Sequence, residues 1–526
     1  MKHRRPAARS RHTLAALAFC AMATAGSLVP AAAVDRTLGA QVPKPSAVGA
    51  SWSPAQQSSL ARDLDAQLAS AVTLKGAHVG ILAIDARDGT VLYNRNGDDA
   101  FMPASTFKML TGSAALERLG PAFRFRTVAF AEGSVQTGVL HGRLVVRGGG
   151  DPLLRVTDFD ELAAALKRVG IGRIDGPVDV DTSHFADPPY MPGWSWDDFP
   201  YYYAPKISAF SFDENVVHLT IAPAHTAGMR AKITAAPYGR VGEPPGGCAL
   251  TSDLIVLPHV MTGAPGSADS VDLERDPGGC VIVKGEIPVD AAPETVDAAV
   301  PSPEVYAWHV LVDRLRVHGI ALTTPRSYAG FAQSVVAAPA SANARVVWTH
   351  ESEPLSDLLA DLWLPSDNLL AELLLKSLGA ATAEPGTATN GVAYETQWLR
   401  TLGIDVAPLS IDDGSGLSAY DRMTPRALVA ILQHDWSAPT RETVLDDLPL
   451  AGVRGTLKSS FVGTLAEKTV FAKTGSVSHV RALAGYAATQ VHGAVIFAFQ
   501  VDDWSGTEVE LNSIRASFLS RIIGDS

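Results

Sequence analysis

Cysteine, charge and long hydrophobic runs are all scarce in this chain. Its 526 residues include 3 cysteines, and charged residues make up 19% of the sequence with a net charge of −12. This composition excludes a small disulfide-dense scaffold, and it argues against a nucleic-acid partner, because phosphate binding requires clustered lysine and arginine. After the N-terminal segment no stretch approaches about 18 consecutive apolar residues, as a membrane-spanning helix requires. The hydrophobic content of 47% indicates a globular protein, and its length predicts two or three domains.

Two common hydrolase motifs are also missing. There is no H-E-x-x-H, so a zinc peptidase has no support. The nearest match to the G-x-S-x-G of α/β-hydrolases is Gly414-Ser415-Gly416, which follows Asp413 and does not fit that frame. We find no internal repeat, and we expect neither a metal nor a cofactor.

The N-terminus has the pattern of a secretory signal peptide. Basic residues are followed by an apolar stretch from Leu14 to about Val29 and then by three alanines that end at Ala33. The alternative is a membrane anchor, but the run is short and rich in small residues. Phe19 before Cys20 disfavours a lipoprotein. We expect cleavage of residues 1–33, no integral membrane anchor after it, and an exported protein that is periplasmic or cell-wall-associated.

Two cysteines remain after such cleavage, Cys248 and Cys280. Export to an oxidising compartment permits a disulfide between them. Its loop length corresponds to roughly 3–4 kcal/mol in the chain-entropy account. Two free buried thiols are the alternative.

The order of expected elements predicts an α/β unit interrupted by a β-rich insertion. Residues 78–85 read as a strand, a turn signal follows, and a helix begins at Ser105. From residue 123 short strand candidates alternate with glycine and proline clusters. The β-rich texture ends near residue 344, helical periodicity returns from residue 356, and the chain ends with a strand hairpin and a final helix. We therefore expect one unit from residues 34–122 plus 345–526, and an insertion from residues 123–344.

The first candidate catalytic motif is S-T-F-K at the start of the predicted helix. Ser105 and Lys108 are three positions apart, so they lie on one face of a helix. A serine hydroxyl is a weak nucleophile that needs a base, and a lysine with a lowered pKa supplies one. The helix start also directs backbone N–H groups and the positive dipole end toward a developing oxyanion.

Two further motifs follow in order. Ser366-Asp367-Asn368 precedes a helix and, taken alone, is an ordinary N-cap. Lys473-Thr474-Gly475 lies on a predicted strand, where a lysine is usually solvated. S-x-x-K, S-D-N and K-T-G in this order are together the signature of penicillin-binding proteins and class A β-lactamases.

With these motifs the chain resembles the low-molecular-mass penicillin-binding proteins of peptidase family S13, D-alanyl-D-alanine carboxypeptidases and endopeptidases. The long interval between Lys108 and Ser366 fits that family, which carries inserted domains there, better than a β-lactamase. V-R-G-G-G-D-P at residues 146–152 and D-G-S-G-L-S at residues 413–418 also resemble it. The resemblance implies an α/β (α+β) serine β-lactamase/transpeptidase-like fold: an antiparallel sheet flanked by helices, with a β-rich insertion between the first two motifs.

The resemblance also implies roles in acyl transfer. Ser105 attacks the carbonyl of the penultimate D-alanine and forms an acyl-enzyme, while Lys108 takes its proton. Ser366 relays a proton to the leaving amine, and Lys473 holds the local positive potential. Peptidoglycan stem peptides are the expected substrates and β-lactams the expected inhibitors.

The same resemblance implies how the peptide is bound. Asn368 bonds its backbone, and Thr474 with Lys473 receives the terminal carboxylate. The oxyanion hole comes from the N–H groups of Ser105 and Ser476. The implied substrate-binding residues in the three motifs are Asn368, Thr474, Gly475 and Ser476.

The insertion carries an aromatic and acidic segment that predicts further contacts. Family relatives bring a Trp and an Asp from this region to the peptide side chain, which implies substrate-binding roles for Trp194 and for Asp197 or Asp198. Ordinary aromatic packing of a loop is the alternative. One departure concerns the position after D-G-S-G-L-S, where the family often has Arg and this chain has Ala419, with Arg422 nearby. The preferred third residue of the peptide is therefore open, as are the oligomeric state and the balance of carboxypeptidase and endopeptidase action.

Two other functions fit parts of the pattern. A β-lactamase or esterase on the same fold would need a device for fast deacylation, and we find no glutamate beside the motifs to serve as one. A non-catalytic cell-wall-binding protein would have lost Ser105, Lys108 or Lys473, and all three are present.

Overall fold

The computed structural model describes residues 42, 44–186, 188–243, 248, 254–323, 340–341 and 343–524. The expected signal peptide, residues 1–33, lies outside the described residues. Within the described ranges, no helix combines the length and hydropathy needed to cross a membrane.

One part of the chain is built on a five-stranded antiparallel sheet of order β16-β17-β18-β1-β2. The N-terminal hairpin β1–β2 and the C-terminal hairpin β17–β18 are those expected from the sequence, and β1 pairs with β18 along its whole length. The central strands are apolar almost without alternation because helices cover both faces of the sheet. The bounds are β1 (His78–Asp85), β2 (Val91–Arg95), β16 (Val470–Val477), β17 (Val480–Ala488) and β18 (Ala494–Asp502).

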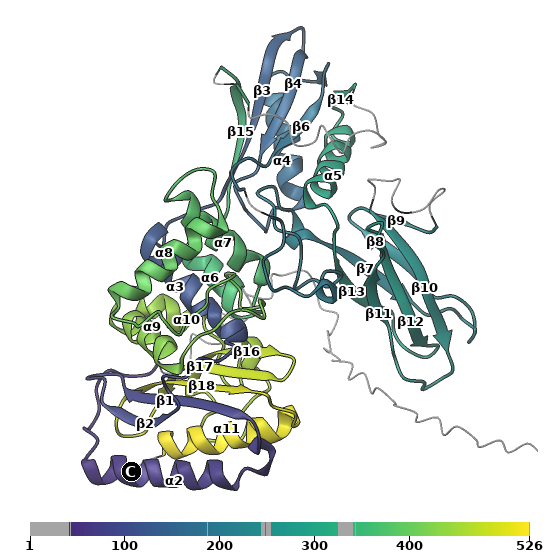
Figure 1. The fold of residues 1–526 in the computed structure, drawn as a ribbon. Coiled ribbons are helices and arrows are strands. Elements are labelled where there is room, and N and C mark those ends of the chain that lie inside the picture. Colours follow the sequence, from purple (N-terminus) through teal and green to yellow (C-terminus); the bar gives the residue numbers. More distant parts are fainter. Residues whose placement is uncertain are drawn as a thin grey trace, which may run out of the picture.

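Two helices cover one face of this sheet and six lie on the other (Figure 1). On the first face, α2 places leucines four residues apart against α11 and the sheet, and Ser53 starts α2 with a capping box. The other face holds the larger core, in which α3 is surrounded by helices. The helices are α2 (Pro54–Ser70), α3 (Lys108–Leu119), α6 (Leu355–Trp363), α7 (Asn368–Ala380), α8 (Ala388–Thr401), α9 (Pro425–Ser437), α10 (Arg441–Asp447) and α11 (Glu508–Ile523).

Between α3 and α6 the chain forms three further sheets that share one hydrophobic core (Figure 1). A six-stranded sheet contains β3, β4, β5, β6, β14 and β15 and packs against α4 (Val156–Arg168) and α5 (Pro303–Val317), two helices that the sequence analysis did not identify. The smaller sheets have the orders β13-β7-β8 and β11-β12-β10-β9. The strands are β3 (Arg126–Gln136), β4 (Val139–Arg147), β5 (Arg173–Ile174), β6 (Val178–Asp181), β7 (Val216–Ala222), β8 (Lys232–Ala236), β9 (Arg240–Val241), β10 (Ile255–Gly263), β11 (Asp272–Arg275), β12 (Val281–Pro288), β13 (Glu294–Ala299), β14 (Ala321–Leu322) and β15 (Arg345–Glu351).

Two details of this inserted region bear on the sequence analysis. Strand β15 pairs with β3, so by hydrogen bonding it belongs with the inserted sheet although its residues follow position 344. Cys248 and Cys280 form a disulfide beside the start of β12, where both are buried in a small apolar cluster.

Candidate active site

Ser105 lies in a one-turn 3₁₀ helix, Ala104–Phe107, that leads directly into α3. Ala104 before it has a φ of 44°, a left-handed conformation that is uncommon for alanine and worth about 1 kcal/mol or more of strain. Gly416 packs against this turn so closely that an added Cβ would lie 2.0 Å from the Ala104 carbonyl oxygen. The turn therefore holds a partly exposed Ser105 hydroxyl above a fully buried helix start.

Lys108 is completely buried, and its amine has three oxygen neighbours. Its Nζ lies 2.9 Å from Ser105 Oγ, 2.5 Å from Asn368 Oδ1 and 2.9 Å from the carbonyl oxygen of Ser415. Burial lowers the pKa of Lys108 to about 8, because the charged ammonium form loses its water. At pH 7, about one unit below this pKa, roughly a tenth of the molecules carry a neutral amine beside the serine hydroxyl.

The second motif contributes from the start of α7. Asp367 is the N-cap, with its carboxylate accepting from the Leu370 N–H at 3.0 Å, as the simple interpretation of S-D-N predicts. Because Asp367 caps the helix, the side chains of Ser366 and Asn368 on either side of it can make other contacts. Asn368 Oδ1 faces Lys108, while its Nδ2 donates to the carbonyl of Tyr203 at 2.6 Å. That second bond fixes the orientation of the amide, so an acceptor oxygen points at the Lys108 amine.

The third motif lies on the edge strand β16. Lys473 is fully buried, and its Nζ donates to Ser366 Oγ at 2.9 Å and to the Thr474 carbonyl at 2.9 Å. Burial, and then the nearby Lys108, lower the pKa of Lys473 well below its usual value. The solvated lysine expected of an isolated edge strand is therefore not what the structure contains.

Glycine allows β16 to approach the serine turn. A Cβ on Gly475 would lie 2.7 Å from the Pro103 carbonyl and 3.1 Å from the Thr106 nitrogen. Next to it, Thr474 donates its hydroxyl to Thr456 Oγ at 2.7 Å, and Ser476 is exposed. The strand edge and the serine turn thus form two sides of one site.

Trp194 of the inserted region is buried, and its indole N–H donates to Asp413 Oδ2 at 2.8 Å. Asp198 accepts from the Tyr203 hydroxyl at 2.9 Å, and burial raises the pKa of its carboxyl. Asp197 is exposed. The structure thus buries Trp194 in the core and leaves Asp197 accessible to ligands. Asp198 is half-buried.

Sequence reasoning missed the part played by the loop at residues 413–418. The loop was noticed for its similarity to the family, but no role was given to the carbonyl of Ser415, which faces Lys108. Arg422 follows this loop and donates to the carbonyls of Ala419 at 3.0 Å and Asp421 at 2.7 Å. The guanidinium thus bonds to the backbone of its own loop.

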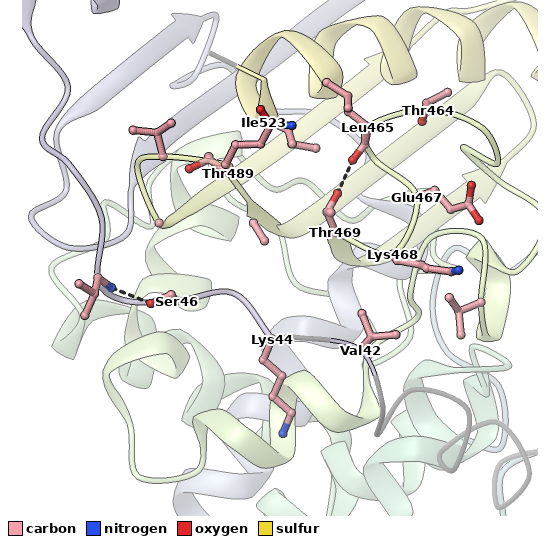
Figure 2. A pocket seen from close by; sticks show the side chains of 16 residues that line it. Val42, Lys44, Ser46, Thr464, Leu465, Glu467, Lys468, Thr469, Thr489 and Ile523 are labelled. Atoms are coloured by element: carbon pink, nitrogen blue, oxygen red, sulfur yellow. Dashed lines mark hydrogen bonds between the residues drawn. The ribbon is translucent and has the colours of Figure 1, made fainter. Parts of the chain in front are cut away.

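A cavity of 910 Å³ lies away from the three motifs. Figure 2 shows Lys44 and Ser46 of the N-terminal segment and Lys468, Thr469 and Ile523 around it. None of its described lining residues belongs to a motif, so it is not the site of the chemistry.

The fold and this site define a penicillin-recognising serine enzyme: a helix-start serine and lysine, a second serine with an amide, and a strand lysine meet beside a five-stranded antiparallel sheet. The sequence model of the D-Ala-D-Ala carboxypeptidase 3 (S13) family matches residues 60–519, and the chain belongs to that family. It is accordingly a serine D-alanyl-D-alanine carboxypeptidase, as the sequence predicted.

Individual relatives agree with this assignment. A D-alanyl-D-alanine carboxypeptidase from Actinomadura sp. (strain R39) is 34% identical over 453 residues, which are 82% of this chain and 79% of that protein. D-alanyl-D-alanine carboxypeptidase DacB from Haemophilus influenzae is 27% identical over 451 residues, 84% of this chain and 89% of that protein. The crystal structure of penicillin binding protein 4 from the same organism superimposes with a TM-score of 0.74 at 24% identity, covering 88% of this chain and 99% of that one. This match confirms the predicted fold class.

Proposed function

We propose that Ser105 is the acylated nucleophile and that Lys108 is its base. The observation that carries the proposal is the set of three oxygens around the Lys108 amine. A neutral amine donates two hydrogen bonds and accepts one. Asn368 Oδ1 and the Ser415 carbonyl only accept, so they take both donors and leave the lone pair for the Ser105 hydroxyl proton.

The reaction then follows in balanced steps. Ser105 Oγ attacks the carbonyl carbon of the penultimate D-alanine as its proton passes to Lys108 Nζ. Collapse of the tetrahedral intermediate breaks the peptide bond. The leaving D-alanine amine takes a proton from the Ser366 hydroxyl, which contacts Lys473, and Ser366 regains a proton from the Lys108 ammonium, so that Lys108 is neutral again. A water molecule then attacks the ester carbonyl as one of its protons passes to Lys108, and the Ser105 oxygen takes that proton as it leaves, which regenerates both groups.

The third motif is suited to an anionic peptide end. Thr474 and Lys473 receive the terminal carboxylate, which restores the charge that burial disfavours on Lys473. The oxyanion lies against the N–H groups of Ser105 and Ser476, and Gly475 permits this approach of the strand. Asn368 bonds the peptide backbone.

We extend the proposal to substrate, inhibitor and place of action. The substrates are peptidoglycan stem peptides, cleaved as a carboxypeptidase and, on cross-linked peptides, as an endopeptidase. β-Lactams acylate Ser105; a complex of the Haemophilus influenzae penicillin binding protein 4 with a β-lactam supports this. Exposed Asp197, with Asp198 beside it, binds an amine on the third peptide residue.

The protein acts outside the cytoplasm after removal of residues 1–33. Residues 34–122 plus 345–526 form its catalytic unit, and residues 123–344 are inserted. Strand β15, at the start of the second catalytic segment, pairs with β3 and so extends the sheet of the insertion.

Digestion of muropeptides of known composition tests the substrate. We expect mass analysis to show loss of one D-alanine from pentapeptides, and conversion of cross-linked dimers to monomers measures endopeptidase action. Pentapeptides that stay intact, with a D-lactate-ended analogue also untouched, would contradict the proposal.

The pH dependence of acylation tests the base. Only the neutral amine of Lys108 accepts the serine proton, and the pKa of Lys108 is about 8. The rate constant for acylation should therefore rise about tenfold per pH unit below this value and level off above it. Stopped-flow measurement with a chromogenic cephalosporin gives the profile. A rate that falls as the pH rises from 6 to 8 would exclude a lysine base.

A further inference from the structure

The carboxylate of Asp413 organises the loop that faces Lys108. Its Oδ1 accepts from the N–H groups of Ser415 at 3.0 Å and Gly416 at 2.6 Å. Its Oδ2 accepts from Ser415 Oγ at 3.1 Å and from the Ser418 N–H at 2.8 Å. Asp413 is fully buried, so these bonds act in a low-dielectric interior and determine the path of the loop backbone.

This loop contacts Lys108 and the turn that carries Ser105. The carbonyl of Ser415 accepts from Lys108 Nζ, and Gly416 packs against the Ala104 carbonyl beside Ser105. Thr111, one turn after Lys108, donates to the Gly414 carbonyl at 2.7 Å. A shift of the loop would therefore move an acceptor that directs the Lys108 lone pair.

Two further side chains from outside the loop also hold it. Glu372 on α7 accepts from the Gly414 N–H with both carboxylate oxygens, at 3.1 and 3.0 Å. Trp194, which comes from the inserted region, donates to Asp413 Oδ2 at 2.8 Å. The indole also packs into the main core of the catalytic part, where it is 8% exposed. The other donors to Asp413 named above belong to the loop itself, whereas the Trp194 N–H comes from the inserted region.

We propose that Trp194 is a positioning residue for acylation: its indole N–H anchors Asp413, and Asp413 sets the Ser415 carbonyl that orients the Lys108 amine. This inference rests on the proposed function, because it assigns Lys108 as the base. It replaces the substrate contact expected for Trp194 from the family resemblance. In this proposal the inserted region helps to position the base, because Trp194 comes from it.

The test is Trp194→Phe, which removes the N–H and keeps an apolar ring in the core. We expect the second-order rate constant for acylation by a fluorescent penicillin to fall roughly tenfold to a hundredfold, the range for losing a hydrogen bond to a charged group. For a D-alanyl-D-alanine peptide, kcat should fall while KM stays within about twofold. The stoichiometry of labelling after long incubation gives the folded fraction, so that rates are expressed per competent site.

Trp398→Phe is the matched control, since Trp398 is a buried indole in the same core that packs edge-on against His434. It should lower the melting temperature and leave acylation within about threefold of wild type. In an Asp413→Asn background, Trp194→Phe should cause no further loss of acylation rate, because both substitutions disrupt the same hydrogen bond between Trp194 and Asp413.

The outcomes distinguish a positioning role of Trp194 from a substrate contact and from a general effect of core packing. Wild-type acylation in Trp194→Phe, or a rise in KM with unchanged kcat, would overturn the positioning role. A fall as large in Trp398→Phe would also overturn it, because a general effect of core packing would then explain the loss. Labelling that survives in Ser105→Ala would instead refute the proposed function itself.

Discussion

Ser105→Ala should abolish turnover of a peptide ending in D-alanyl-D-alanine, lowering kcat by at least about 10⁴-fold. In the proposed mechanism this hydroxyl forms the covalent bond, and its proton passes to the Lys108 amine 2.9 Å away. The helix start, the buried lysines and β16 remain in place, because Ser105 is partly exposed and a smaller side chain creates no core cavity. Release of D-alanine, measured by mass spectrometry, gives the rate.

Ser437→Ala is the matched control. Ser437 lies at the end of α9, where its hydroxyl donates to the Gln433 carbonyl. This variant should keep wild-type turnover. Turnover in Ser105→Ala above a hundredth of the wild-type rate, in protein with an unchanged melting temperature, would show that another group is the nucleophile.

Lys108→Met should lower the rate constant for acylation by about 10³-fold or more, the range expected when a general base is lost. Methionine has a similar length and no charge, so the buried space stays filled. Ser105 then has no group to take its proton. The residual rate should also lose its rise between pH 6 and 8, because the titrating amine is gone.

Lys376→Met makes the same change at another buried lysine. Lys376 lies on α7, the helix that also carries Asn368, and its Nζ donates to the Ala186 carbonyl at 2.8 Å. Its substitution should leave acylation within about threefold. Equal losses in the two variants would mean that burial of a lysine, and not its role as base, determines the rate.

The three motifs could be predicted from the sequence because each has a local signal. Ser105 and Lys108 are one helical turn apart, and S-D-N and K-T-G stand at the start of a helix and on a strand. Both hairpins of the central sheet also have local turn signals and apolar runs. These features need no knowledge of the rest of the chain.

The remaining features depend on contacts between distant segments. Asn368 Nδ2 bonds to the carbonyl of Tyr203, and Trp194 bonds to Asp413. No periodicity or spacing indicates which backbone carbonyl meets which side chain across such intervals. The helices α4 and α5 were missed because glycine and proline clusters around them are typical of a β-rich region.

The central claim is that Ser105 is the residue that becomes acylated, and peptide mapping after penicillin labelling tests it most directly. The labelled protein is digested, and the modified peptide is identified by fragmentation in a mass spectrometer. A single adduct on Ser105, one per molecule, is the predicted result. An adduct on any other residue, or none under conditions that label a known penicillin-binding protein, would contradict it.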